Sequence, residues 1–250
     1  MADPTTSSRS GTSLLDGIEA VLFDLDGVIT PTARVHERAW REVFEEVLPL
    51  VAASSQAVYR DDDYHLHIDG RSRYEGVATL LTAHGVDLPL GLPSDAPGVD
   101  SVCAIGNMKN EVFARILARD AIEPYPDALL LMEDLRSAGV RMALVSSSAN
   151  ASAVLTAAGL DTAFSVIVDG NVIAAEGLQG KPDPDPFLEA AERLGVSSQA
   201  CAVVEDAISG VEAGAAGEFG LVIGVARDGD HERLHEAGAD VVVSDLRELL

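Results

Sequence analysis

Ala20-Val-Leu-Phe-Asp-Leu-Asp-Gly27 decides the fold, because an apolar run stops there at two aspartates and a glycine. A short run rich in β-branched and aromatic residues, bounded by polar ones, indicates a buried strand. Later runs of the same character also end in polar residues, at positions 140–145, 201–204 and 221–225. Residues 241–243 are a further expected strand.

Helical patterns separate these apolar runs, over residues 125–138, 151–158, 186–194 and 208–215. Strands that alternate with helices predict an α/β fold, a doubly wound parallel sheet of Rossmann-like type with helices on both faces. Ligands bind beyond the carboxyl ends of the strands in such sheets. We therefore expect the polar clusters at those ends to meet in one crevice.

Residues 32–121 break the alternation and are far too many for an ordinary loop. Helices are expected over 34–48, 72–84 and 107–118, with an irregular stretch at 88–102 that is rich in proline and glycine. We predict a helical cap domain over 32–121, inserted into an α/β core of residues 16–31 and 122–250. Residues 1–15 are predicted to be a disordered leader.

Acidic residues dominate the charge of the chain, with 17 lysines and arginines against 41 aspartates and glutamates, a net charge of −24. Such a chain repels polyanions, so nucleic acid is not an expected partner, and a phosphate site needs local positive charge. Cys103 and Cys201 have no zinc or redox spacing and are expected as free thiols of a cytoplasmic protein. No segment predicts a membrane span, and a monomer is the default expectation.

Carboxylates end two of the expected strands: Asp24 and Asp26 the first, Glu205 and Asp206 the third. Either pair alone has an ordinary explanation, an Asx turn for the first and a helix N-cap for the second. Together they would place four carboxylates in one crevice, where repulsion raises their pKa values unless a cation is bound. Oxygen ligands favour Mg²⁺ over zinc.

Lys181 and Ser146 could supply the groups that a phosphoryl site needs. Lys181 lies in Gly180-Lys-Pro-Asp-Pro-Asp-Pro186, where prolines restrict the loop that holds its charge. Ser146 ends the second strand with a hydroxyl and nearby N–H groups. A solvated surface lysine and a plain serine turn are the ordinary alternatives for each.

Taken in chain order, these motifs resemble those of the haloacid dehalogenase-like phosphotransferases. The resemblance implies that Asp24 attacks phosphorus and forms an aspartyl phosphate, while Asp26 acts as general acid and base. It implies that Ser146 and Lys181 hold the phosphoryl oxygens. Mg²⁺ would be held by Asp24, Asp206 and the carbonyl of Asp26, with Glu205 assisting.

The inserted segment resembles the β-phosphoglucomutase family. Its resemblance rests on Phe23-Asp-Leu-Asp-Gly-Val-Ile-Thr30, on Asp69-Gly-Arg-Ser-Arg-Tyr-Glu-Gly76 and on Gly106-Asn-Met-Lys-Asn110. These matches imply three sets of residues around a small phosphorylated sugar. The first set is Thr32, His36 and Lys109, which position Asp26 when the cap closes, with Trp40 as a further matching cap residue. The second is Gly70, Arg71 and Arg73, on the distal phosphate, and the third is Ser148 and Asn150, which complete the phosphate pocket.

The resemblance implies interconversion of β-glucose 1-phosphate and glucose 6-phosphate through β-glucose 1,6-bisphosphate. Two positions depart from the family pattern. Pro31 replaces the usual aspartate at the hinge, and Ala149 replaces a lysine that some members carry in the phosphate pocket. A sugar-phosphate phosphatase on the same machinery is therefore the alternative, and a non-catalytic acidic binding protein is a second one.

Overall fold

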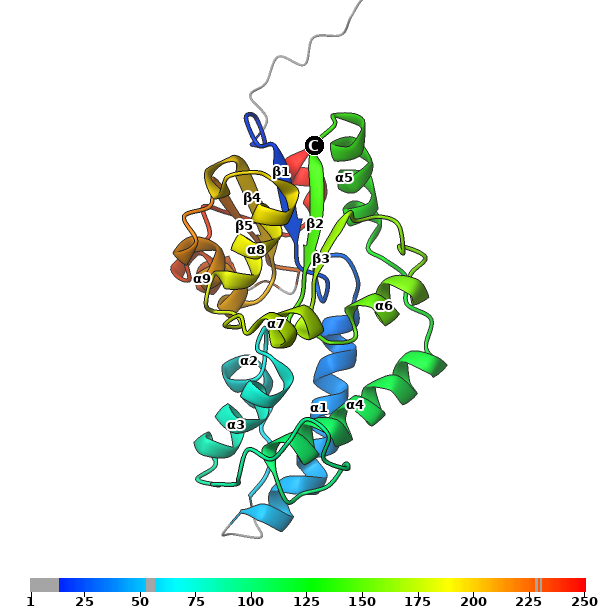
Figure 1. The fold of residues 1–250 in the computed structure, drawn as a ribbon, viewed down its shortest axis with the longest axis vertical. Coiled ribbons are helices and arrows are strands. Elements are labelled where there is room, and N and C mark those ends of the chain that lie inside the picture. The colour runs from blue at the N-terminus through cyan, green and yellow to red at the C-terminus, as the bar shows by residue number, and fades with distance from the viewer. Residues whose placement is uncertain (1–13, 53–56, 228, 230) are drawn as a thin grey trace, which may run out of the picture.

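A parallel six-stranded sheet forms the centre of the molecule, in a computed structural model that describes residues 14–52, 57–227, 229 and 231–250 (Figure 1). The strand order is β3-β2-β1-β4-β5-β6, so the first strand lies in the middle. The strands are β1 Ala20–Phe23, β2 Arg141–Val145, β3 Val166–Val168, β4 Cys201–Glu205, β5 Leu221–Val225 and β6 Val241–Val243. The predicted doubly wound α/β core is confirmed, with β3 as a strand that sequence analysis missed.

Alternate residues of β1 belong to two separate apolar cores, one on each face of the sheet. Val21 and Phe23 are buried in one core, Ala20 and Leu22 in the other. Apolar side chains on both faces explain why the strand reads as a continuous hydrophobic run. The helices around the sheet are α5 Pro126–Ser137, α6 Ala151–Ala157, α7 Gly170–Glu176, α8 Asp185–Leu194, α9 Ile208–Ala216 and α10 His231–Glu236, with short 3-10 turns at Ser198–Ala200 and Leu246–Leu249.

Four helices between β1 and α5 form a separate layer below the carboxyl ends of the strands (Figure 1). They are α1 Thr32–Val51, α2 Asp63–His67, α3 Arg73–Ala83 and α4 Val102–Arg119. The short α2 and the core helices α7 and α10 were not expected. Each has only five to seven residues, too few for a clear helical period.

All six strands lie outside residues 32–121 and helices α1 to α4 lie inside them. The chain leaves and re-enters the core at neighbouring points, because the Tyr125 N–H donates to the Ile29 carbonyl at 2.9 Å. The division into core and cap at these boundaries remains a prediction. The predicted leader falls largely on residues 1–13, which lie outside the described residues.

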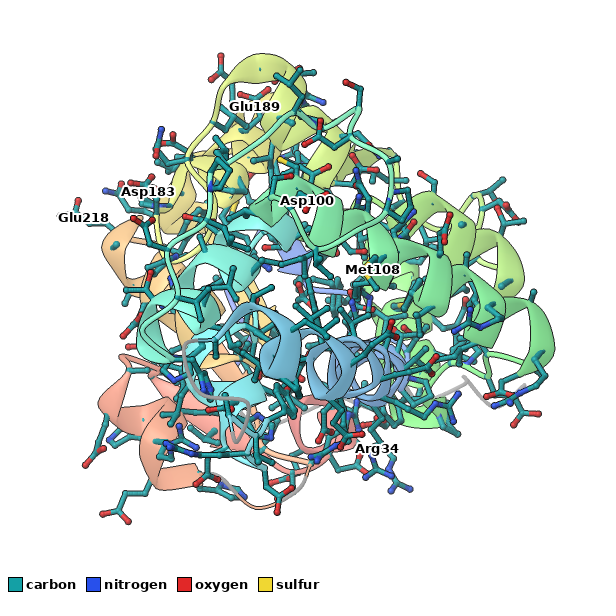
Figure 2. The ribbon with its side chains drawn as sticks, turned by 90° about the horizontal axis from the view of Figure 1, so that it is seen from below. Arg34, Asp100, Met108, Asp183, Glu189 and Glu218 are labelled. Carbon is teal, nitrogen blue, oxygen red and sulfur yellow. The ribbon has the colours of Figure 1, made fainter. Side chains whose placement is uncertain are left out.

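The acidic surplus lies at the surface of the core. Carboxylates of Asp183, Glu189 and Glu218 point outwards from its rim (Figure 2). Both cysteines, Cys103 and Cys201, are buried free thiols. Within the described residues, no helix is both long enough and apolar enough to cross a membrane.

Stacked aromatic rings hold the inner face of α1 in the cap. Phe44 is fully buried, with its ring centroid 5.5 Å from that of Trp40 and 5.9 Å from that of Tyr59. We expect Phe44→Ala to lower the free energy of unfolding by about 3–5 kcal/mol, because it leaves a cavity in a packed core. Leu50→Ala, at an exposed site of the same helix, should change it by less than about 0.5 kcal/mol. Urea titrations of both variants test this, and equal losses would contradict it.

Candidate active site

Asp24 and Asp26 follow β1 in a turn that the chain itself holds in place. The Asp24 N–H continues the sheet by donating to the Val204 carbonyl at 2.9 Å, and the Asp26 N–H donates to Asp24 Oδ2 at 2.8 Å. Gly27 follows with φ of +94°, and a Cβ there would lie 1.8 Å from Asp206 Oδ2. The glycine therefore lets the turn pass directly against the next carboxylate.

Lys181 is fully buried and joins three of the strand ends. Its Nζ donates to Asp24 Oδ1 at 2.6 Å, to Glu205 Oε1 at 2.7 Å and to the Val145 carbonyl at 3.1 Å. Burial disfavours the ammonium, but Asp24 and Glu205 outweigh it and raise the pKa of Lys181. The lysine therefore stays charged inside the site.

Burial raises the pKa of Asp24 well above its usual range, and Glu205 and Asp26 raise it further against the opposing effect of Lys181. Burial, followed by Glu205 and Asp69, raises the pKa of Asp206 in the same way. The four predicted carboxylates do line one cavity, and Lys181 bonds to two of them, Asp24 and Glu205.

This donor set fits Mg²⁺ in chemistry. Asp24, Glu205, Asp206 and the carbonyl of Asp26 offer oxygen ligands only, and a cation would relieve the repulsion that raises the pKa values. In the part of the chain that the structure describes, no three acidic, histidine or cysteine side chains are already gathered at ligand spacing. Lys181 instead bonds to Asp24, so the carboxylate side chains would have to rotate before they could bind a metal ion.

The loop after β2 brings hydroxyl and amide groups to the same cavity. Ser146 Oγ lies 3.4 Å from Asp26 Oδ2 and accepts the Ser148 N–H at 3.1 Å. Ser148 Oγ in turn accepts the Asn150 N–H at 3.2 Å. These hydrogen bonds fix the shape of the loop. All of its residues from Ser146 to Asn150 line the cavity.

The cap reaches Asp26 through residues of α1. Thr32 Oγ1 donates to Asp26 Oδ1 at 2.5 Å, and His36 Nε2 lies 3.5 Å from the same oxygen without a hydrogen bond. Burial, Lys109 and Arg73 lower the pKa of His36 well below its usual range, so the imidazole is neutral. Burial raises the pKa of Asp26.

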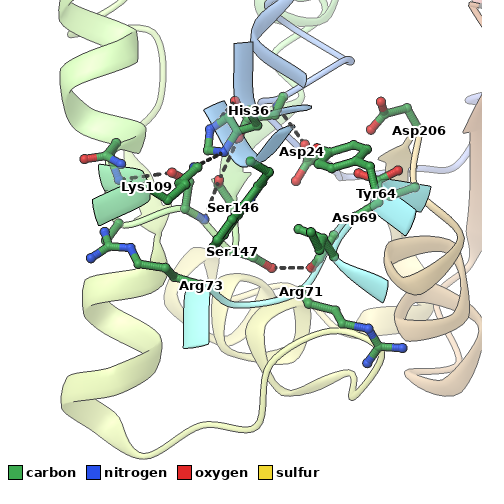
Figure 3. Close-up of a pocket in the computed structure, with 18 of the residues that line it drawn as sticks. Asp24, His36, Tyr64, Asp69, Arg71, Arg73, Lys109, Ser146, Ser147 and Asp206 are labelled. Atoms are coloured by element: carbon green, nitrogen blue, oxygen red, sulfur yellow. Dashed lines mark hydrogen bonds and ion pairs between the residues drawn. The ribbon is translucent and has the colours of Figure 1, made fainter. Parts of the chain in front are cut away.

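Lys109 lies beside His36 (both labelled in Figure 3) and beside two aromatic rings. Its Nζ is 2.7 Å from His36 Nδ1, 5.1 Å from the Trp40 ring and 4.6 Å from the Phe113 ring. An ammonium that donates to Nδ1 leaves the proton of the neutral imidazole on Nε2, the nitrogen that faces Asp26. Thr32, His36, Trp40 and Lys109 are thus brought together as expected.

Arg73 lies where the cap meets the loop after β2. Its Nη2 donates to Asn110 Oδ1 at 3.1 Å, and Asn150 Nδ2 donates to that same oxygen at 2.9 Å. Arg71 also borders the cavity, but its guanidinium points away from Arg73 (Figure 3), toward a second cavity of about 730 Å³. The geometry therefore separates Arg71 from Arg73, which the sequence placed together.

Several residues at the site were not found from the sequence. Tyr64 and Asp69 line the cavity, and Ser147 and Ser209 contact the cap. Arg227 follows β5 and supports the catalytic turn from outside. Asp69 begins a motif quoted from the sequence but was given no role there, and no motif distinguishes the others, since their role depends on which segments lie beside them.

Arg227 makes three hydrogen bonds, two of them to the turn after Asp26. It donates to the Gly27 carbonyl at 2.8 Å, to the Val28 carbonyl at 2.9 Å and to Asp127 Oδ2 at 2.9 Å. Its guanidinium also lies 3.7 Å from the centre of the Tyr125 ring. The arginine thereby ties the catalytic turn to the segment that returns from the cap.

The cavity that these residues enclose measures only about 60 Å³. Pockets that bind small molecules commonly measure about 300–1,000 Å³. A sugar phosphate would therefore need the cap to move away from the core before it could enter.

The fold and the site define a superfamily. Residues 18–217 match a family model described as haloacid dehalogenase-like hydrolase, so the chain belongs to the haloacid dehalogenase-like superfamily of phosphatases and mutases. A β-phosphoglucomutase from Mycobacterium tuberculosis is 42% identical over 244 residues, covering 95% of this chain and 93% of that protein. Within the superfamily, the chain falls in the β-phosphoglucomutase family.

Two further comparisons are consistent with this placement. The crystal structure of a β-phosphoglucomutase from Clostridium difficile matches with a TM-score of 0.74 and 27% identity, covering 93% of each chain. A phosphorylated carbohydrates phosphatase from Thermotoga maritima is 30% identical over 229 residues, covering 90% of this chain and 94% of that protein. The family resemblance drawn from the sequence is confirmed.

Lys109 should make stability depend on pH. Burial lowers its pKa to about 7 from an ordinary value of 10.5, against the attraction of Asp26. Between these values the unfolded chain binds a proton that the folded chain lacks, so stability rises with pH. We expect the free energy of unfolding of the wild type, relative to Lys109→Met, to increase from pH 7 to pH 9.5.

Urea titrations at several pH values measure this difference. Arg136→Met, on the exposed face of α5, removes a charge that does not titrate in this range and should give a constant difference from the wild type. A difference for Lys109→Met that stays constant or falls with pH would show that Lys109 remains protonated when folded.

Proposed function

We propose that the protein is a Mg²⁺-dependent β-phosphoglucomutase that interconverts β-D-glucose 1-phosphate and D-glucose 6-phosphate. The observation that carries the proposal is the contact of cap residues with Asp26, through Thr32 at 2.5 Å and His36 backed by Lys109. A mutase benefits from assembling its acid and base only when the cap excludes water, because water would hydrolyse the phosphorylated enzyme. The similarity to β-phosphoglucomutases supports the same reading.

Asp24 is the proposed nucleophile. A carboxylate oxygen of Asp24 forms a bond to phosphorus of β-glucose 1,6-bisphosphate, and the bond between phosphorus and the sugar oxygen breaks. Asp26 donates a proton to the departing sugar oxygen, and its raised pKa favours the protonated form. Transfer of the 1-phosphoryl group to Asp24 in this step leaves glucose 6-phosphate as product. In the second step the 6-hydroxyl of β-glucose 1-phosphate attacks the phosphoryl group on Asp24, Asp26 accepts the proton of that hydroxyl, and the bond between Asp24 and phosphorus breaks, which regenerates β-glucose 1,6-bisphosphate.

Hydrogen-bond donors held in fixed positions are proposed to stabilise the negative charge on the phosphoryl group during its transfer. Lys181 and Ser146 are the proposed ligands of the phosphoryl oxygens, and both stand next to the aspartates. Mg²⁺, when bound by Asp24, Asp206 and the Asp26 carbonyl with help from Glu205, would neutralise phosphoryl charge.

The second phosphate of the sugar is proposed to bind between cap and core. Arg73, Ser148 and Asn150 are the proposed ligands, and Arg73 is already linked to Asn150 through Asn110. Ala149 lines the same cavity and brings no charge there, so the guanidinium of Arg73 is the proposed charge at this point. Gly70 and Arg71 remain predicted contacts of the same phosphate.

A sugar-phosphate phosphatase is the second candidate function. The similarity to the phosphatase from Thermotoga maritima favours it, and so does Pro31 immediately before α1, which restricts the hinge. A cytoplasmic monomer stays a prediction. The two activities differ in whether water or a sugar hydroxyl takes the phosphoryl group from Asp24.

Phosphorus NMR separates the two activities. With Mg²⁺, β-glucose 1-phosphate and a trace of β-glucose 1,6-bisphosphate, we expect glucose 6-phosphate to form without a matching rise in inorganic phosphate. Asp24→Asn should abolish turnover while keeping the circular dichroism spectrum of the wild type. Accumulation of inorganic phosphate would identify a phosphatase, and full turnover by Asp24→Asn would refute the nucleophile.

Arg73→Ala should weaken the mutase reaction more than the hydrolysis of a simple ester, because β-glucose 1-phosphate would place its phosphate at Arg73 while its 6-hydroxyl faces Asp24. Loss of a charge-assisted hydrogen bond predicts a fall of roughly 10- to 100-fold in kcat/KM for β-glucose 1-phosphate. Hydrolysis of phenyl phosphate, which has no second phosphate, should change little. Arg136→Ala is the matched control, and equal losses on both substrates would assign Arg73 a structural role.

A further inference from the structure

Two serine hydroxyls of the core hold neighbouring carbonyls of one cap loop. Ser147 Oγ donates to the Gly70 carbonyl at 2.7 Å, and Ser209 Oγ donates to the Asp69 carbonyl at 3.1 Å (Figure 3 shows the first bond). Both acceptors are backbone groups. The contact therefore depends on the position of the loop backbone and uses no hydrogen-bonding side chain of the loop.

The two serines stand on opposite sides of the proposed nucleophile. Ser147 follows β2 and Ser209 lies in α9 after β4, and these two strands flank β1 in the sheet. The loop at Asp69 and Gly70 thus spans the end of the strand that carries Asp24. Asp69 and Gly70 both line the narrow cavity, so releasing this loop would open the cavity on that side.

Gly70 makes the close approach possible. Its φ is +71°, and a Cβ at this position would lie 2.0 Å from Ser209 Oγ and 3.2 Å from Ala207 Cβ. Only glycine has both the conformation and the space. The backbone of the cap loop therefore lies directly against the core.

We propose that Ser147 and Ser209 form a latch that holds this loop closed and so decides whether water or a sugar hydroxyl receives the phosphoryl group. The choice of acceptor rests on the proposed mutase function, whereas the latch itself does not. The serines are positioning residues, since their hydroxyls bond to the cap and not to the aspartates. Loss of the latch admits water without removing any group that takes part in phosphoryl transfer.

The size of the effect follows from the strength of a neutral hydrogen bond. Removing one hydroxyl should shift the closing equilibrium roughly fivefold, and removing both roughly 25-fold. Ser147→Ala, Ser209→Ala and the double variant test this, with Ser137→Ala on the exposed end of α5 as control.

Hydrogen exchange of the full-length protein measures the latch without reference to catalysis. We expect the amides of residues 68–72 to exchange about fivefold faster in each single variant and about 25-fold faster in the double variant. The control should match the wild type. Unchanged exchange in the double variant would overturn the latch, whatever the enzyme does.

Phosphorus NMR measures the choice of acceptor in the same proteins. The ratio of inorganic phosphate to glucose 6-phosphate should rise in step with exchange, about fivefold and about 25-fold. If hydrogen exchange is faster but the ratio of inorganic phosphate to glucose 6-phosphate is unchanged, the latch does not decide whether water or a sugar hydroxyl receives the phosphoryl group. A wild type that releases only inorganic phosphate would overturn the proposed mutase function and leave the latch supported by exchange alone.

Discussion

Burial of positive charge among carboxylates is the constraint on which the site depends. The chain has only two lysines, Lys109 and Lys181, and both are buried at this site. An unpaired ammonium in an apolar interior is strongly destabilising, so each lysine must be stabilised by the groups that contact it. Lys181 has Asp24 and Glu205, while Lys109 has aromatic rings and a neutral imidazole. The two environments move the pKa values of the two lysines in opposite directions, although the residues are chemically identical.

The site is assembled from two parts of the chain that meet at one strand end. The core supplies the aspartates, Lys181 and the loop after β2, and the cap supplies Thr32, His36 and Lys109. Because Thr32 of α1 bonds directly to Asp26, a movement of this helix would change the surroundings of the proposed acid and base as well as access to the cavity. Arg227 and Tyr125 hold the two linkers on the core side, so the moving part can be limited to the helices beyond them.

The strongly negative surface has a consequence for ligand binding. A molecule with a net charge of −24 repels a sugar phosphate at long range, and salt screens that repulsion beyond about 10 Å. Binding must therefore be decided by short-range groups inside the cavity. Lys181, Arg73 and the N–H groups of the loop after β2 are such groups, and a divalent cation would add to them.

Strand ends, catalytic motifs and the family were determined by the sequence alone, because each is local: an apolar run, a pair of carboxylates, a lysine between prolines. Five of the six strands and the long helices were predicted, whereas β3, α2, α7 and α10 were too short to carry a periodic signal. Only the tertiary structure decided which side chains face one another. It turned Arg71 away from Arg73, placed Arg227 behind the catalytic turn and set Ser147 and Ser209 against the cap loop. These contacts join residues between 77 and 200 positions apart, and no local pattern records a distance of that kind.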